Sequence, residues 1–214
     1  VANYRNQWAS MGKAYQTMAI SVDASMLKTK KNKAYLGMGL FVFNDRAGVA
    51  KMGSTQGQLH INGIIKTGKK SKLAGAVYIG FNQNSASYAS LTYASQYDGK
   101  VIDNTLASGE VVTYASFMST DVGAGLNYEF SSANIDMLRD DIFSLKIGGA
   151  VHHINKPVQK FASGSTYQLP MRFVGNIQAR IDIKGTKLAI LPSVIYLRQA
   201  TATEITIGTH LRYR

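Results

Sequence analysis

The stretch Glu204-Ile205-Thr206-Ile207-Gly208-Thr209-His210-Leu211-Arg212-Tyr213 alternates between apolar and polar residues. Successive side chains of a β-strand point to opposite faces, so a period of two predicts a strand. One face is mostly large and apolar, whereas the other carries glycine, histidine and charges of both signs. Residues 122–130 and 176–183 repeat the pattern. Large apolar side chains outside and small or polar ones inside are typical of transmembrane barrels.

The predicted strands are long, at roughly 10–16 residues against about 5–6 in an average globular strand. A tilted strand needs about 9–11 residues to cross a hydrocarbon core. We predict strands at residues 3–11, 14–26, 34–44, 57–67, 72–84, 115–130, 142–155, 168–184, 188–200 and 204–214. The expected fold class is therefore all-β, a transmembrane antiparallel β-barrel with about ten strands in this chain. The longest apolar run, residues 34–43, is far below the roughly 18 residues that indicate a membrane helix.

The predicted connections differ in length according to the end of the strands at which they lie. The shorter set is at residues 27–33, 68–71, 131–141 and 185–187, and the longer set includes 45–56, 85–114 and 156–167. Short turns at one end and long loops at the other are typical of outer-membrane barrels. Residues 91–97 could be a further strand, but one extra strand would invert this order. We therefore assign them to the long loop.

The charge is strongly positive, with 24 Lys and Arg against 12 Asp and Glu, a net charge of +12 among 214 residues. Such a charge suggests nucleic acid or an anionic membrane surface as a partner. Many of the lysines collect in predicted short turns, at Lys28, Lys30, Lys31, Lys33, Lys69, Lys70, Lys72, Lys184 and Lys187. These turns lack the interleaved aromatic residues on which bases stack. A soluble nucleic-acid-binding β-protein is thus disfavoured, and no nucleic-acid partner is expected.

Catalytic and metal-binding motifs are missing from the sequence. It has no Cys, no G-x-S-x-G, no H-E-x-x-H and no phosphate-binding glycine loop. His152 and His153 are neighbours in a predicted strand and are expected to point to opposite faces, so they would not share a metal ion. We expect no enzyme activity and no cofactor. The pairs Gly37-x-Gly39 and Gly123-x-Gly125 are interpreted as places of close packing on a barrel wall.

Six residues on the polar faces are predicted to form a charge network in the lumen: Glu129, Arg180, Asp182, Glu204, His210 and Arg212. One interpretation is that the network only neutralises charges buried inside a barrel. The other is that it holds a plug or lines a pore.

Five strings, in this order, carry a family resemblance: YRNQW at 4–8, LGMGLFVFNDRAG at 36–48, TDVGAGLNY at 120–128, HINKP at 153–157 and LPSVIY at 191–196. Together they resemble the PorP/SprF family of Bacteroidota outer-membrane proteins. The resemblance covers nearly the whole chain. It implies a single outer-membrane barrel domain over residues 1–214, incomplete at both ends and belonging to a barrel of about fourteen strands.

The resemblance also implies a function in the type IX secretion system. Members of the family serve protein export and the surface attachment of adhesins, including gliding adhesins, that carry a C-terminal sorting domain. The implied partners are other components of that system within a hetero-oligomeric complex, the adhesin C-terminal domain and outer-membrane lipid. The family offers no established active site to carry over.

The matched strings place a set of residues at predicted strand ends: Trp8, Asn44, Asp45, Arg46, Gly48, His153, Asn155, Lys156 and Pro157. We expect the pair at 44–45 to start a turn. The proline should stop its strand at the rim, and the tryptophan should sit at the membrane interface.

Two functions follow as hypotheses. In the first, the chain docks cargo or translocon partners through its lumen or through the loops 45–56, 85–114 and 156–167. In the alternative, it is a passive transport channel of the fatty-acid-transporter or porin type. Its path would then be lined by Arg180, Asp182, Glu204 and Arg212.

Overall fold

A computed structural model describes residues 1–10, 14–26, 34–86, 91–109, 116–132, 143–162 and 165–213. Within these ranges almost all regular structure is β-strand. The elements in chain order are β1 (Ala2–Gln7), β2 (Tyr15–Met26), β3 (Ala34–Ala47), β4 (Met52–Lys66), β5 (Ser71–Ser85), the 3-10 helix η1 (Ala94–Gln96), β6 (Ser116–Ser131), β7 (Phe143–His152), β8 (Val158–Ala162), β9 (Ser165–Gln168), β10 (Arg172–Asp182), β11 (Leu188–Gln199) and β12 (Ala202–Tyr213).

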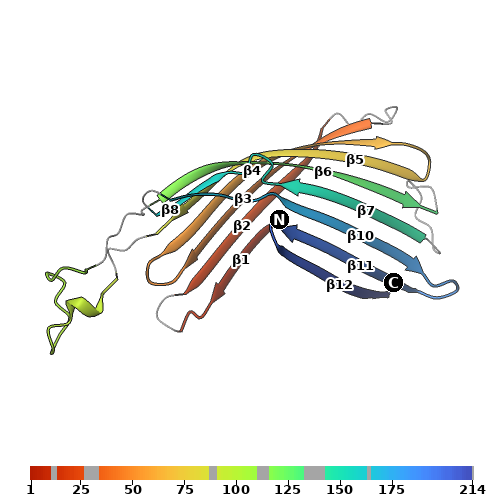
Figure 1. Ribbon diagram of the computed structural model, residues 1–214. Helices are drawn as coiled ribbons and strands as arrows, with labels where there is room; N and C mark the ends of the chain where they lie inside the picture. The colour runs from red at the N-terminus through yellow and green to blue at the C-terminus, as the bar shows by residue number, and fades with distance from the viewer. Residues whose placement is uncertain are drawn as a thin grey trace.

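Ten of the strands form one curved antiparallel sheet (Figure 1). Their order is β1-β2-β3-β4-β5-β6-β7-β10-β11-β12, so each strand pairs with its neighbour in the chain except where the hairpin β8–β9 is inserted. The ten strands predicted from the alternation are all present, but the first, expected at residues 3–11, is short and ends at Gln7. The sheet is not closed: β1 and β12 are its two edges.

The two faces of the sheet differ as the alternation predicts. In β6 the even-numbered side chains are the more exposed, whereas Asp121, Gly123 and Ser131 on the other face are buried. Leu126 is 66% exposed on the apolar face, and Tyr78 is 7% exposed on the polar face. Side chains converge on the inside of a curve and spread apart on its outside. The polar face is therefore the inner face of the sheet, and the apolar face is the outer one.

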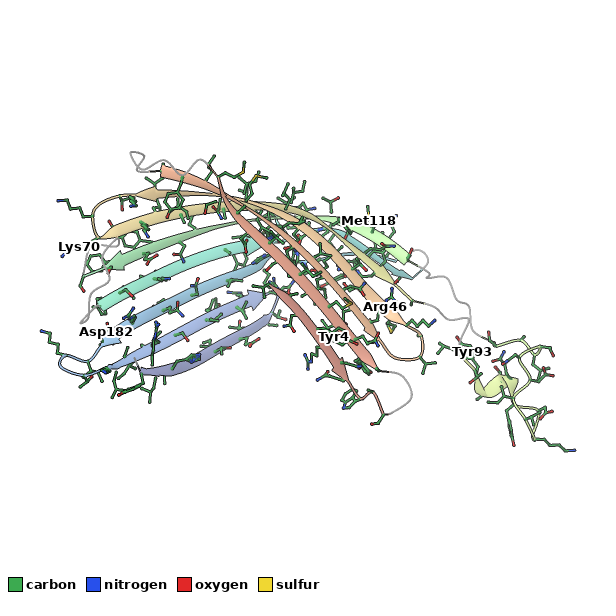
Figure 2. All side chains as sticks on the ribbon, turned by 180° about the vertical axis from the view of Figure 1, so that it is seen from behind. Tyr4, Arg46, Lys70, Tyr93, Met118 and Asp182 are labelled. Atoms are coloured by element: carbon green, nitrogen blue, oxygen red, sulfur yellow. The ribbon has the colours of Figure 1, made fainter. Side chains whose placement is uncertain are left out.

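The two ends of the strands also differ. One end, here called the short-turn end, has the turns at residues 67–70 and 183–187. The other, the long-connection end, has the loop 91–109 and the segment 153–171, which contains β8 and β9. Figure 2 shows Lys70 and Asp182 at the first end, and Arg46 and Tyr93 toward the second. The predicted turn 27–33 and residues 133–141 of the predicted turn 131–141 lie outside the described residues.

The loop assignment of residues 91–97 is confirmed, because they form η1 and adjoining irregular backbone outside the sheet. The predicted long loop 45–56 is wrong. β3 continues to Ala47 and β4 begins at Met52, leaving a turn at 48–51. Asn44 and Asp45 therefore lie inside β3 and do not start a turn. Cross-strand hydrogen bonds satisfy their side chains, from the Asn44 amide to Thr55 (2.7 Å) and from the Thr17 hydroxyl to Asp45 (2.6 Å).

The end of β7 is a second correction. The strand was expected to run to residue 155 and to be stopped by Pro157, but it ends at His152. The next residue, His153, has a φ of 58°. A left-handed backbone cannot continue a strand, so the chain turns there. The predicted loop 156–167 also contains regular structure, the hairpin β8–β9.

Candidate functional site

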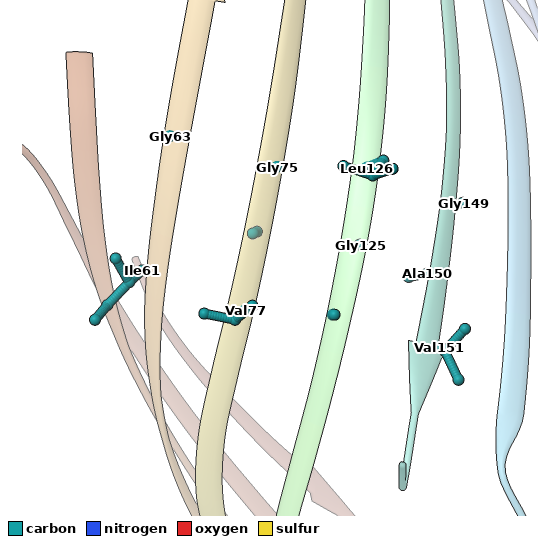
Figure 3. A pocket seen from close by; sticks show the side chains of 11 residues that line it. Ile61, Gly63, Gly75, Val77, Gly125, Leu126, Gly149, Ala150 and Val151 are labelled. Atoms are coloured by element: carbon teal, nitrogen blue, oxygen red, sulfur yellow. The ribbon is translucent and has the colours of Figure 1, made fainter. Parts of the chain in front are cut away.

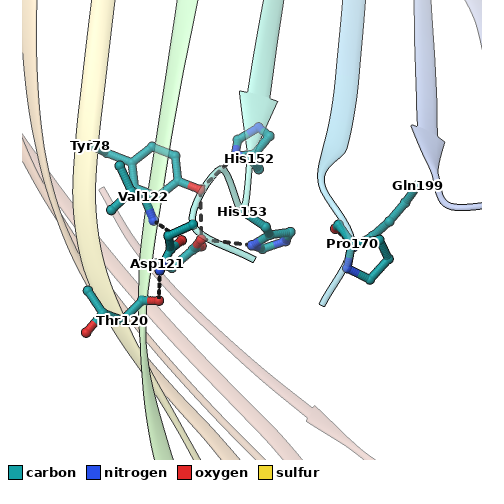
Figure 4. A network of polar contacts seen from close by, with 9 residues as sticks. Tyr78, Thr120, Asp121, Val122, His152, His153, Pro170 and Gln199 are labelled. Atoms are coloured by element: carbon teal, nitrogen blue, oxygen red, sulfur yellow. Dashed lines mark hydrogen bonds and ion pairs between the residues drawn. The ribbon is translucent and has the colours of Figure 1, made fainter. Parts of the chain in front are cut away.

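A polar cluster lies on the inner face near the long-connection end (Figure 4). The Tyr78 hydroxyl, from β5, donates to Asp121 Oδ2 on β6 (3.1 Å) and lies 3.0 Å from His152 Nδ1 on β7. The tyrosine thus spans three strands. It can do so because Gly123, between it and β7, has no side chain: a Cβ there would collide with the Tyr78 ring.

His153 joins the same cluster from the turn that follows β7. Its Nδ1 lies 2.9 Å from Asp121 Oδ1, so both carboxylate oxygens of Asp121 have a partner. The left-handed backbone of His153 redirects its side chain, which in a continuing strand would point to the outer face. The expectation that His152 and His153 point apart is therefore wrong.

His60, distant in sequence, also lies in this region of the inner face. Its ring is 5.2 Å from the ring of Tyr78, and the ring of His152 is 5.5 Å from Tyr78 on the other side. The side chains nevertheless do not form a metal centre: among the described residues, no group of three or more histidines and carboxylates is arranged to hold a metal ion. Instead, the Tyr78 hydroxyl, the Asp121 carboxylate and the two imidazoles at the end of β7 contact one another. These contacts connect β5, β6 and β7.

The HINKP string extends that fastening into the long connection. The Asn155 amide donates to the Thr120 carbonyl (2.7 Å), and its oxygen accepts from the Val122 amide (3.2 Å). The Ile154 amide also donates to the Val122 carbonyl (3.0 Å). Side chain and backbone of this turn thereby continue the pairing with β6 after β7 has ended.

Lys156 and Pro157 complete the turn. Lys156 has a left-handed φ of 45°, and its amide donates to the His153 carbonyl (2.9 Å). The Pro157 carbonyl accepts from the Leu169 amide (3.0 Å), which closes the base of the β8–β9 hairpin. The matched string therefore anchors a loop through its left-handed backbone and the side chains of His153 and Asn155, rather than by the proline stopping a strand.

Three other matched positions lie at the same end. Trp8 has a φ of 55° directly after β1, and its ring packs edge-on against Tyr15 with centroids 5.0 Å apart. Arg46 is exposed near the end of β3. Gly48, with a φ of 71°, supplies the left-handed position that the turn to β4 requires.

Only part of the predicted charge network is brought together. Arg180 and Asp182 form a two-pronged ion pair, with Nε–Oδ1 and Nη2–Oδ2 both 2.8 Å. In the cross-strand register Glu129 lies opposite Lys72 on β5 and Lys146 on β7, where opposite charges attract.

The other three members, Glu204, His210 and Arg212, all lie on the exposed edge strand β12. The Glu204 carboxylate accepts from the Thr206 hydroxyl (3.2 Å). Arg212 is in the same cross-strand row as Asp182, with Ala189 of β11 between them. For these three residues of β12, membership in a charge network of the lumen remains a prediction.

The loop 91–109 has its own internal order, which sequence reasoning did not find. Gln96 is 7% exposed, and its side chain accepts from the Tyr93 amide (3.0 Å) and donates to the Leu106 carbonyl (3.1 Å). The backbone carbonyl of Gln96 accepts from the Asp103 amide (2.8 Å). The buried side chain therefore joins two points of the loop, and the backbone of the same residue joins a third.

Two aspartates shape the tip of this loop. Asp98 accepts from the amides of Lys100 and Val101, both at 2.7 Å, and these backbone donors lower the pKa of its carboxyl. Asp103 accepts from the hydroxyl and the amide of Thr105, which lowers the pKa of that carboxyl in the same way. Such turns are local to the sequence, because an aspartate side chain accepts from the backbone two residues further on.

The ordered loop presents apolar side chains to solvent. Val101 is 61% and Ile102 is 53% exposed, and Tyr97 and Leu106 are exposed as well. The loop extends well away from the sheet (Figure 1). Exposed apolar groups that are held in place, and not buried against the protein, are typical of a surface that contacts a partner.

The outer face has a shallow apolar depression of about 660 Å³ (Figure 3). It follows a cross-strand row in which four of five residues are glycine, namely Gly63, Gly75, Leu126, Gly149 and Gly175. Ile61, Val77 and Val151 rise along one side of the row. The depression is part of a face whose exposed side chains are mostly apolar, with polar exceptions such as Thr120 and Arg198 toward the long-connection end.

A sheet with an apolar outer face and a polar inner face defines a β-structured membrane protein. No helix within the described ranges is long and apolar enough to span a membrane. The family model described as type IX secretion system membrane protein PorP/SprF matches residues 1–214, and the chain belongs to this family. The resemblance drawn from the five strings is thereby confirmed. Comparison with curated proteins and with solved structures gave no significant match.

Proposed function

We propose that this chain is an outer-membrane, barrel-forming component of the type IX secretion system that docks protein partners at its long-connection end. The partners are secreted adhesins, through their C-terminal sorting domain, or other components of the system. Membership in a family of secretion-system membrane proteins, rather than of enzymes, supports this function. The two faces of the sheet support insertion in a membrane as part of a barrel.

The loop 91–109 is the observation that carries the docking proposal. Its buried Gln96 holds the backbone in one arrangement, so little conformational entropy is lost when a partner binds. Val101 and Ile102 supply the exposed apolar contact area. At the other connection of this end, the cluster around Asp121 holds the turn that leads to the β8–β9 hairpin. Residues 91–109 and 153–157 of the two long connections thus have internal hydrogen bonds without a partner.

The test places two charges on the loop in the double variant Val101→Asp with Ile102→Asp. Burying carboxylates in a protein contact is unfavourable, so we expect secretion and surface display of the adhesins to fall by about tenfold or more. The matched control, Val49→Asp with Ala50→Asp, puts the same charges in the turn 48–51 of the same end. It should secrete normally. Equal secretion by both variants at equal protein levels would contradict the proposal.

The channel hypothesis has one observation in its favour, the polar inner face with its Arg180–Asp182 pair. Conductance of the purified protein in planar bilayers distinguishes it from docking. A large steady conductance that changes in Arg180→Gln would favour the channel, whereas docking requires none.

A further inference from the structure

Two turns of the short-turn end are strongly basic. The turn between β4 and β5 contains Lys69 and Lys70, and the turn between β10 and β11 contains Lys184 and Lys187. All four lysines are exposed. Neither turn contains an aspartate or a glutamate. Among the described residues, the nearest carboxylates on the inner face have cationic neighbours of their own: Asp182 is paired with Arg180, and Glu129 faces Lys72 and Lys146 across the strands.

The apolar outer face reaches up to these lysines. Ile65 and Leu73 are the last outer-face pair before the first turn, and Ile183 and Leu188 stand in the same place at the second. All four side chains are exposed. Lys184 and Lys187 are each one residue away from such a side chain. A lysine stem can lie along apolar surface while its ammonium group stays in a polar layer.

The opposite end has a different charge pattern. The loop 91–109 and the ends of β3 and β12 contain residues of both signs, namely Asp45, Asp98, Asp103 and Glu204 together with Arg46, Lys51 and Lys100. The uniform positive sign is therefore a property of these two turns and not of every connection at this end, because the sequence between β6 and β7 contains Asp136, Asp140 and Asp141.

We propose that the lysines of these two turns bind the phosphate headgroups of anionic phospholipids, so that the short-turn end lies at the phosphate layer of one leaflet. This inference rests on the membrane insertion proposed above. The two turns are separated in the sheet by β6 and β7, so β5 and β10 are three strand spacings, about 14 Å, apart. The lysines are spread along one edge of the sheet, and the apolar outer face ends at this edge. Such a distribution of charge suits a plane of lipid headgroups better than a compact acidic protein.

The experiment compares the full chain with two fourfold variants of equal charge change. The first replaces Lys69, Lys70, Lys184 and Lys187 with Gln. The second, a control, replaces the exposed residues Arg46, Lys100, Lys160 and Arg198 of the opposite end with Gln. Each purified protein is exchanged into micelles that contain phosphatidylglycerol and phosphatidylcholine in equal amounts. Native mass spectrometry then counts the retained lipids of each class, and added salt tests for an electrostatic contribution.

The wild-type chain and the opposite-end variant should retain phosphatidylglycerol preferentially. The turn variant should lose that preference by about tenfold or more, since each lysine near an anionic surface adds to the electrostatic attraction. Equal retention of both lipids by the wild type would overturn the proposal. So would a preference that survives in the turn variant.

A further arm adds a polyglutamate peptide as an acidic protein probe. Tight binding of the peptide to the turns, without any lipid preference, would overturn the lipid proposal in favour of an acidic partner. Secretion assays on the same variants are independent of the lipid counts. If the turn variant loses its lipid preference but secretes normally, the lipid proposal is supported and the docking proposal is unaffected. If only the variant Val101→Asp with Ile102→Asp loses secretion, docking is supported and the lipid proposal is unaffected.

Discussion

The long-connection end is ordered in two places, and the two differ in how far apart their residues lie in the sequence. The cluster around Asp121 joins residues 32 to 74 positions apart. In the loop 91–109, the Gln96 side chain joins positions no more than 10 residues away. The first set of contacts can form only when β5, β6 and β7 are already paired. The second can form within a single segment. Substitutions in the cluster should therefore lower the stability of the whole sheet, whereas substitutions in the loop should lower the stability of the loop alone.

The largest effect should come from Gly123→Ala. A Cβ at this position meets the Tyr78 ring, so the ring must move and its hydroxyl leaves Asp121. Overpacking and the lost hydrogen bond should together lower the free energy of unfolding by about 2–3 kcal/mol. Urea unfolding in phospholipid vesicles measures this change.

The control for that variant is Gly63→Ala on the outer face. The nearest atom to a Cβ at Gly63 is Leu36 Cδ2, at 3.7 Å, an ordinary contact. We expect a change within about 0.5 kcal/mol. Equal losses in both variants would mean that the Tyr78 contacts do not fasten the strands.

A smaller and local effect should follow from Gln96→Ala. The substitution removes the hydrogen bonds to the Tyr93 amide and the Leu106 carbonyl, and about 1–2 kcal/mol of local stability with them. Hydrogen exchange of amides within residues 91–109 should accelerate about tenfold, while global unfolding stays unchanged. A fall in global stability would show that the loop and the sheet unfold as one cooperative unit. The loop would then not be independent of the sheet.

The smallest effect should be a pH dependence confined to the same loop. The carboxyl pKa values of Asp98 and Asp103 are lower in the folded loop than their ordinary value of about 4. Their stabilising hydrogen bonds are therefore fully present above that value and are lost as the pH falls through the folded pKa. The protection factors of the Lys100, Val101 and Thr105 amides, which correct the exchange rate for its intrinsic dependence on pH, should fall below pH about 4. In Asp98→Asn the fall at Lys100 and Val101 should vanish, because an amide does not titrate.

Much of the sheet could be predicted from the sequence, because strand alternation is a property of neighbouring residues. The ten strands, the two faces and the loop status of residues 91–97 followed from it. The extent of β3 and β4 did not. Asn44 and Asp45 are usual turn formers, and only the cross-strand partners Thr55 and Thr17 keep them in a strand.

The polar cluster could not be predicted for the same reason. Its members are unremarkable in sequence, and the φ of His153 reversed the expected direction of that side chain. One signal was available. Gly123-x-Gly125 marked a place where a side chain from another strand crosses, although nothing in the sequence identified it as Tyr78. Gln96 gave no comparable signal, because its burial depends on how the loop folds around it.

Trp8 has an optical consequence. It is the only tryptophan in the sequence, and it is held edge-on to Tyr15, with ring centroids 5.0 Å apart across the β1–β2 pair. Excitation energy absorbed by that tyrosine will pass to the indole, and its emission will depend on whether the first two strands stay paired. The protein thus contains a native fluorophore at one edge of its sheet, and separation of that edge can be followed without attaching a dye.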